Sequence, residues 1–92
     1  MKTPPKKLTK WLAMMAEIYG PLMTMDGYDH CIAGVCFLAG HEPVLIYDRA
    51  KVIATLVAGG MTEEDAEEFH AFKQAGAFMG PRTPAFLEVP EL

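Results

Sequence analysis

The stretch that decides the fold is residues 44–69, which have the sequence VLIYDRAKVIATLVAGGMTEEDAEEF. Its apolar opening, Val44 to Tyr47, is typical of a buried strand. Asp48 follows as a helix N-cap, because its carboxylate can accept hydrogen bonds from the free amides of the next turn. The apolar spacing then predicts a helix from Arg49 to Ala58, which Gly59 ends. A strand is thus joined directly to a helix.

A second helix begins after Thr62, which precedes Asp65 in a capping-box arrangement, and it ends at Gly76. Acidic residues fill its first turn, where they favour the positive end of the helix dipole. Its inner face is expected to consist of Ala66, Phe69 and Phe72, together with Lys73 or Gly76.

On the N-terminal side, apolar residues recur every three or four positions over residues 6–19 and predict an amphipathic helix. Residues 30–38 fit either a buried strand or a short helix, and the strand is favoured because residues 44–47 supply a hairpin partner. Residues 84–88 can pair as an edge strand. We therefore expect an α+β fold, with three helices packed on a small antiparallel sheet that contains the hairpin of residues 30–47.

Length and charge restrict the function classes. Ninety-two residues form one domain, residues 1–92, with residues 1–5 expected to be a flexible basic stub. No apolar run reaches the length of a membrane span, and no signal peptide is expected. Residues 1–10 carry four lysines and no acid, so the remaining four basic and twelve acidic side chains give the rest of the chain −8. Such a body repels phosphates, and nucleic acid is a disfavoured partner.

The two cysteines, Cys31 and Cys36, lie five positions apart and point to opposite faces of a strand, so no disulfide is expected. Reduced thiols indicate a cytoplasmic protein. A metal site or an active centre built on Asp29, His30 and Cys36, with His41, is an alternative. Its spacing differs from the usual zinc frameworks, and no basic neighbour other than His30 would activate a thiol. We expect no enzyme activity, no metal and no cofactor.

Five acids within six residues, 63–68, form the densest charge feature of the chain. They fit a solvated helix start, but carboxylates at helical spacing can also occupy a basic cleft of a partner protein. Phe78 and Met79 put large apolar side chains in the loop of residues 78–82, where they either pack under the helices or form an exposed contact surface. The residues expected to bind protein are Glu64, Glu67, Glu68, Phe78 and Arg82. Trp11 and Met15 are candidate contacts for a homo-oligomer.

Short motifs follow one another in a set order from residue 26 to residue 86: GYD at 27–29, IAGVC at 32–36, EPV at 42–44, YD at 47–48, KVI at 51–53, GMTEE at 60–64, AEEF at 66–69 and TPAF at 83–86. This pattern resembles a family of small uncharacterised bacteriophage and prophage proteins. Two positions depart from the pattern. The family usually has Asn where this chain has Lys73, and its aromatic residue is often Trp where this chain has Phe78. The resemblance implies a viral accessory protein and no particular activity, so it assigns no functional residue.

Together these observations predict a small phage-type accessory protein that acts by protein–protein binding, as an inhibitor of a host or defence protein. Two alternatives stay open. One is a metal-binding protein or enzyme based on Asp29, His30, Cys36 and His41. The other is a nucleic-acid accessory protein that uses the N-terminal lysines.

Overall fold

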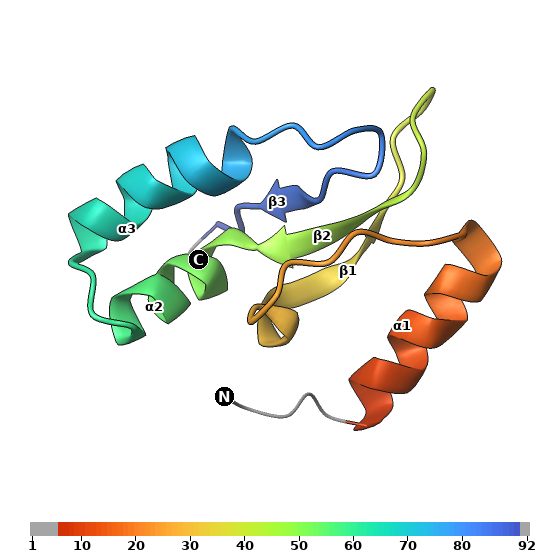
Figure 1. The fold of residues 1–92 in the computed structure, drawn as a ribbon, viewed down its shortest axis with the longest axis horizontal. Coiled ribbons are helices and arrows are strands. Elements are labelled where there is room, and N and C mark those ends of the chain that lie inside the picture. Colours follow the sequence, from red (N-terminus) through yellow and green to blue (C-terminus); the bar gives the residue numbers. More distant parts are fainter. Residues whose placement is uncertain (1–5, 91–92) are drawn as a thin grey trace.

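The computed structural model describes residues 6–90, so the expected stub at residues 1–5 lies outside the described residues. Within residues 6–90, three α-helices and three strands confirm the α+β fold (Figure 1). The elements in chain order are α1 (Lys6–Tyr19), the 3-10 turn η1 (Asp29–Cys31), β1 (Ile32–Cys36), β2 (Val44–Asp48), α2 (Arg49–Ala58), α3 (Glu63–Phe69), the π-helical turn η2 (His70–Ala75) and β3 (Ala85–Leu87).

The sheet has the order β1-β2-β3, with β2 in the centre. β1 and β2 form the expected antiparallel hairpin, with Val35 opposite Leu45, so the strand interpretation of this segment is confirmed. β3 is the expected edge strand, but it runs parallel to β2, with Ile46 opposite Ala85. The sheet is therefore mixed and not wholly antiparallel. The reason is the connection: the chain leaves β2, passes through α2 and α3, and returns in the same direction.

The core lies where β2, α2 and α3 meet. Alternate residues of β2 point inward, and Leu45 and Tyr47 are fully buried. From α2, Val52 and Leu56 pack against them, and α3 adds Ala66. The Tyr47 hydroxyl also accepts a hydrogen bond, which the backbone N–H of Met25 donates over 2.7 Å. This bond ties the loop after α1 to the central strand.

Two buried groups in this core lose a proton only at alkaline pH, the Cys31 thiol and the Tyr47 phenol, and they make the stability of the fold sensitive to alkali. Burial raises the pKa of the Cys31 thiol above its ordinary 9.0 and that of the Tyr47 phenol above 10.0. The unfolded chain therefore loses these protons first, so its ionisation favours unfolding. We expect the urea midpoint to hold through neutral pH and to fall as pH rises above 9.0.

The control for this alkaline effect is the double variant Cys31→Ala/Tyr47→Phe, which removes both titrating groups. Its midpoint at neutral pH is lower, but its fall with pH is expected to be shallower than that of the wild type. Equal slopes in the two proteins would contradict the assignment.

Both predicted N-caps are present. The amide of Lys51 donates to the Asp48 carboxylate over 3.2 Å, and the amide of Asp65 donates to the Thr62 hydroxyl over 3.1 Å. These bonds fix where α2 and α3 begin, because they satisfy amides that have no partner within the helix.

The end of the acidic helix differs from the prediction. From His70 onward the backbone widens into the π-helical turn η2, which rotates the following residues. His70 takes the inner position and is buried, while Phe72, expected on the inner face, is 73% exposed. Gly76 closes this turn at a point where a Cβ atom would lie 2.8 Å from the carbonyl oxygen of Ala71. A side chain at position 76 would therefore strain the turn.

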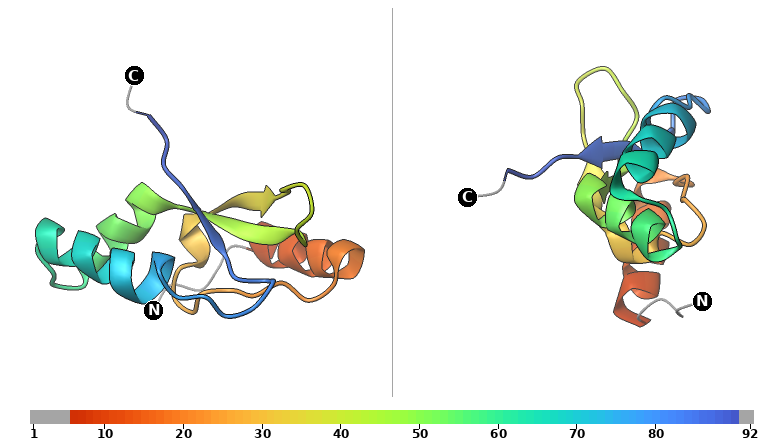
Figure 2. Two further views of the ribbon diagram at one scale, coloured as in Figure 1. Left: turned by 90° about the horizontal axis from the view of Figure 1, so that it is seen from above. Right: turned by 90° about the vertical axis from the view of Figure 1, so that its left-hand side faces the viewer.

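Helix α1 lies at the other end of the molecule from α2 and α3 (Figures 1 and 2). It has no fully buried residue. Trp11 packs against the core, so it is less available as a contact than predicted, whereas Met14 and Ile18 are half exposed or more. The helix ends at Gly20, whose φ of 85° lies in the left-handed region that glycine adopts readily.

Candidate functional site

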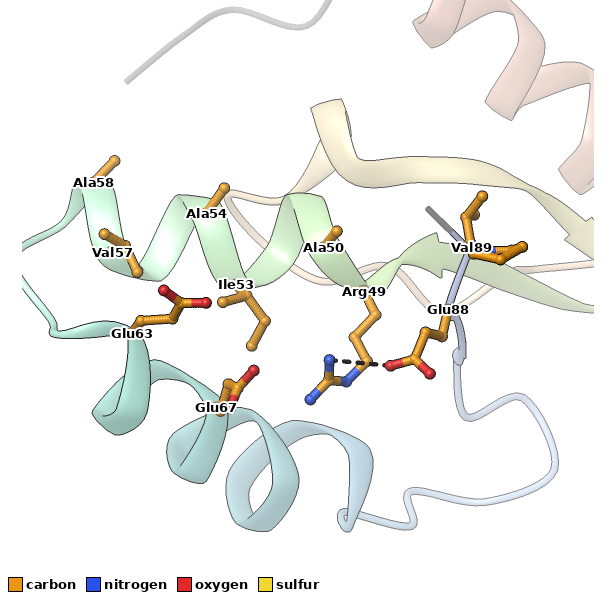
Figure 3. Close-up of a pocket in the computed structure, with 11 residues that line it drawn as sticks. Arg49, Ala50, Ile53, Ala54, Val57, Ala58, Glu63, Glu67, Glu88 and Val89 are labelled. Carbon is orange, nitrogen blue, oxygen red and sulfur yellow. Dashed lines mark hydrogen bonds and ion pairs between the residues drawn. The ribbon is translucent and has the colours of Figure 1, made fainter. Parts of the chain in front are cut away.

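A groove of about 820 Å³ runs along the exposed side of α2. It is bounded by α3 on one side and by the tail that follows β3 at one end (Figure 3). Its lining residues are Arg49, Ala50, Ile53, Ala54, Val57, Ala58, Glu63, Glu67, Glu88, Val89 and Pro90. We call this hollow the α2 groove.

The floor of the α2 groove is apolar. Ala50, Ala54 and Ala58 follow one another at intervals of one helical turn, and Ile53 and Val57 form a second row beside them. The sequence produces this surface because Val52 and Leu56 turn to the core, Ile53 lies buried at the border between core and groove, and the alanines are left outside. Along the row of alanines only methyl groups stand on the helix surface, so that side of α2 allows the backbone of another chain to approach closely.

The edge of the α2 groove is acidic. Glu63 and Glu67 stand one turn apart on α3, and both side chains point toward α2 (Figure 3). At the other end, the Arg49 guanidinium lies 3.5 Å from the Glu88 carboxylate, an exposed pair that contributes little to stability. Three carboxylates against one guanidinium leave the edge negative, so the groove attracts a basic partner.

The predicted acidic face is divided by the structure between two sides of α3. Glu67 lies in the α2 groove. Glu68 lines a separate shallow hollow with Asp65, Phe72 and Lys73, while Glu64 is exposed and lines neither hollow. Only one of the three predicted glutamates therefore contributes to the groove.

The two predicted contact residues of the C-terminal loop have different surroundings. Phe78 is 81% exposed, so it is free to meet a partner. Arg82 is engaged inside the molecule: its guanidinium donates to the carbonyl oxygens of Tyr19, over 2.7 Å, and Pro43, over 3.0 Å. It also lies 3.6 Å from the Glu42 carboxylate. Arg82 thus holds the end of α1 against the hairpin.

The residues of the alternative metal site are not grouped together in the described part of the chain. Within residues 6–90, no three His, Cys, Asp or Glu side chains are grouped so that they could hold a metal ion. His30 instead pairs with Thr55, whose hydroxyl oxygen lies 2.7 Å from Nε2 and 3.6 Å from Sγ of Cys31. The Thr55 hydroxyl donates to the carbonyl oxygen of Lys51, so the Cys31 thiol must donate to Thr55. Because burial raises its pKa, this thiol stays protonated and is a poor nucleophile.

The two thiols should differ in reactivity. Cys31 is fully buried and Cys36 is partly exposed. With Ellman's reagent, we expect Cys36 to react at once. Cys31 should react more slowly by a factor on the order of 100 or greater, because it reacts only when the structure opens. The variant Cys36→Ser, in which only the slow phase remains, assigns the phases. Equal rates for both thiols would show that Cys31 is accessible.

His70 has a place in the core that sequence analysis missed. Its Nδ1 lies 2.8 Å from Oε1 of Gln74, and its ring meets Phe86 edge to face at 4.6 Å. Among the described residues, its Nε2 has no hydrogen-bond partner. The signal was present in the sequence, since position 70 lies four residues after Ala66 on the same helix face.

The floor of the α2 groove was also missed. Alanines at positions 50, 54 and 58 form a stripe that marks a flat helix face. The sequence gives no sign that residues 88–90 return to this face. The pairing of β3 with β2, which joins distant segments, places the tail there.

Comparisons with protein-family models, with curated proteins and with solved structures gave no match. Within residues 6–90, no helix has the length and apolar character needed to cross a membrane.

Proposed function

We propose that this chain is a protein-binding module whose α2 groove receives a basic amphipathic helix of a partner protein. The observation that carries the proposal is an apolar floor with two carboxylates, Glu63 and Glu67, along its edge. A helix that lies in a groove uses one apolar face for contact. Lysines beside that face can then reach the carboxylates, which speeds association and selects against acidic partners.

The dimensions of the floor support a helix of about two turns. From Ala50 to Ala58 the helical rise amounts to about 12 Å. A contact of this length buries less surface than a permanent complex, so the interaction is expected to be transient. The exposed Phe78 adds an apolar contact outside the groove.

This activity fits the accessory role that the phage-family resemblance implies. Many helices that bind nucleic acid are basic, and a module that covers such a helix inhibits its owner. The partner is then a host or defence protein of the cytoplasm. The proposal needs no catalytic group and no cofactor.

The direct test uses a fluorescent synthetic helix of leucine and lysine at helical spacing as the probe. We expect a dissociation constant on the order of 10 µM for the full chain. The variant Glu63→Lys/Glu67→Lys should weaken binding at least about tenfold, because it turns the attraction at the edge into repulsion.

The matched control is Glu64→Lys/Glu68→Lys, which changes the net charge equally on the same helix but outside the groove. Its binding should stay within about twofold of the wild type. If the two variants lose binding equally, the acidic helix acts only through its total charge, and the groove is not the site. If the wild type does not bind the probe, the proposed function fails.

A further inference from the structure

We infer that the α2 groove also receives helix α1 of a second copy of this chain, so that self-association regulates access to the site. The inference rests on the proposed function, since it names a particular basic amphipathic helix as an occupant of the same groove. It follows from the exposure of α1, from the order of charges along it, and from its position in the molecule.

Helix α1 presents an exposed face that is basic at one end and apolar at the other. Lys7, Lys10, Met14 and Ile18 follow at spacings of three and four residues and so lie on one face. Met14 is 50% exposed and Ile18 is 59% exposed. No side chain of α1 is fully buried within its own molecule. The helix therefore keeps apolar surface for a partner.

The charges of α1 match those of the α2 groove in one direction. When α1 of a second copy lies antiparallel to α2, Lys7 and Lys10 come to the end where Glu63 stands, beside Val57 (Figure 3). Met14 and Ile18 then lie over the apolar floor.

The lengths agree with this alignment. Lys10 and Ile18 are separated by the same eight residues as Ala50 and Ala58, about 12 Å of helix. Glu17, near the end of α1, comes toward Arg49 at the far end of the groove. The opposite direction would place Glu17 beside Glu63, so the charges select the antiparallel arrangement.

The position of α1 requires that the contact be made between copies. Within one molecule, α1 lies at the end opposite to α2 and α3 (Figures 1 and 2). Each copy therefore offers a helix at one end and a groove at the other, which is a head-to-tail contact. A groove that holds α1 cannot hold a partner helix, so self-association at high protein concentration competes with partner binding.

The experiment is sedimentation velocity of the full chain over a range of concentrations at low salt. The wild type is expected to associate as its concentration rises. The variants Lys7→Glu/Lys10→Glu and Glu63→Lys/Glu67→Lys should each need at least about tenfold higher concentration to associate, because like charges then meet. The control Glu64→Lys/Glu68→Lys should associate as the wild type does.

Mixing supplies the decisive comparison. In an equimolar mixture of the two charge-reversed variants, each helix again faces a groove of opposite sign, so association should return. This recovery also shows that both variants are folded. A wild type that stays monomeric throughout, or a mixture that does not associate, overturns the inference.

The leucine–lysine probe separates this failure from that of the proposed function. If the probe binds a wild type that never associates, the groove is a binding site and α1 is not its occupant. If the wild type associates and the probe neither binds nor dissociates the assembly, the association uses another surface and both proposals fail. Dissociation of the wild-type assembly by the probe supports both.

Discussion

Replacement of Tyr47 by alanine is expected to lower the free energy of unfolding by about 4 kcal/mol, since large-to-small changes at buried aromatic residues remove packing and leave a cavity. Tyr47 is fully buried in the central strand, and its ring packs beside that of Phe86 with centroids 6.1 Å apart. The variant therefore loosens β3 as well as the core. Urea unfolding followed by circular dichroism measures the loss.

Tyr47→Phe separates the ring from the hydroxyl. The ring stays, but the amide of Met25 loses the oxygen to which it donates. Leaving a half-buried donor unpaired is expected to cost about 1–3 kcal/mol. If Tyr47→Phe were as stable as the wild type, the bond to Met25 would be unimportant. If it were as unstable as Tyr47→Ala, the hydroxyl would matter more than the ring.

Arg82→Ala is expected to have the second largest effect, about 3 kcal/mol, because hydrogen bonds from a charged group contribute more than neutral ones. The guanidinium joins the last carbonyl of α1, at Tyr19, to the hairpin carbonyl of Pro43. It is also a cation at the negative end of a helix. Because α1 has no fully buried residue, we expect its amides to exchange hydrogen faster in the variant while those of α2 change little.

Arg82→Lys is the matched control. Lysine keeps the positive charge but lacks the planar fork that reaches two carbonyl groups together, so it should restore only part of the stability. Unchanged exchange of the α1 amides in Arg82→Ala would show that α1 is held by its apolar contacts alone. Full recovery in Arg82→Lys would show that charge, and not geometry, anchors the helix.

Local patterns predicted most of the elements. The caps at Asp48 and Thr62 are hydrogen bonds within three residues, so the sequence contains both partners. The direction of β3 was not predictable in this way. It depends on where α2 and α3 carry the chain, and a three-residue strand has no pattern that distinguishes parallel from antiparallel pairing.

The candidate site was predicted less completely, because its parts come from separate segments. Glu67 was expected as a contact residue, and it lines the α2 groove. Arg82 was expected on the surface, but its partners Tyr19 and Pro43 are distant in the sequence and only the fold brings them together. His70 was missed although its position, four residues after buried Ala66, places it on the inner face of the helix.

The short pairing of β3 has a consequence for how long the α2 groove persists. β3 holds on to β2 through three residues, and Glu88 and Val89, which close one end of the groove, follow it directly. Elements with few local contacts are the first to detach in partial unfolding, well before the whole domain melts. Each such excursion removes one wall while leaving α2 and α3 in place. A bound helix would then dissociate in two ways: from the intact groove, or while Glu88 and Val89 are detached from it.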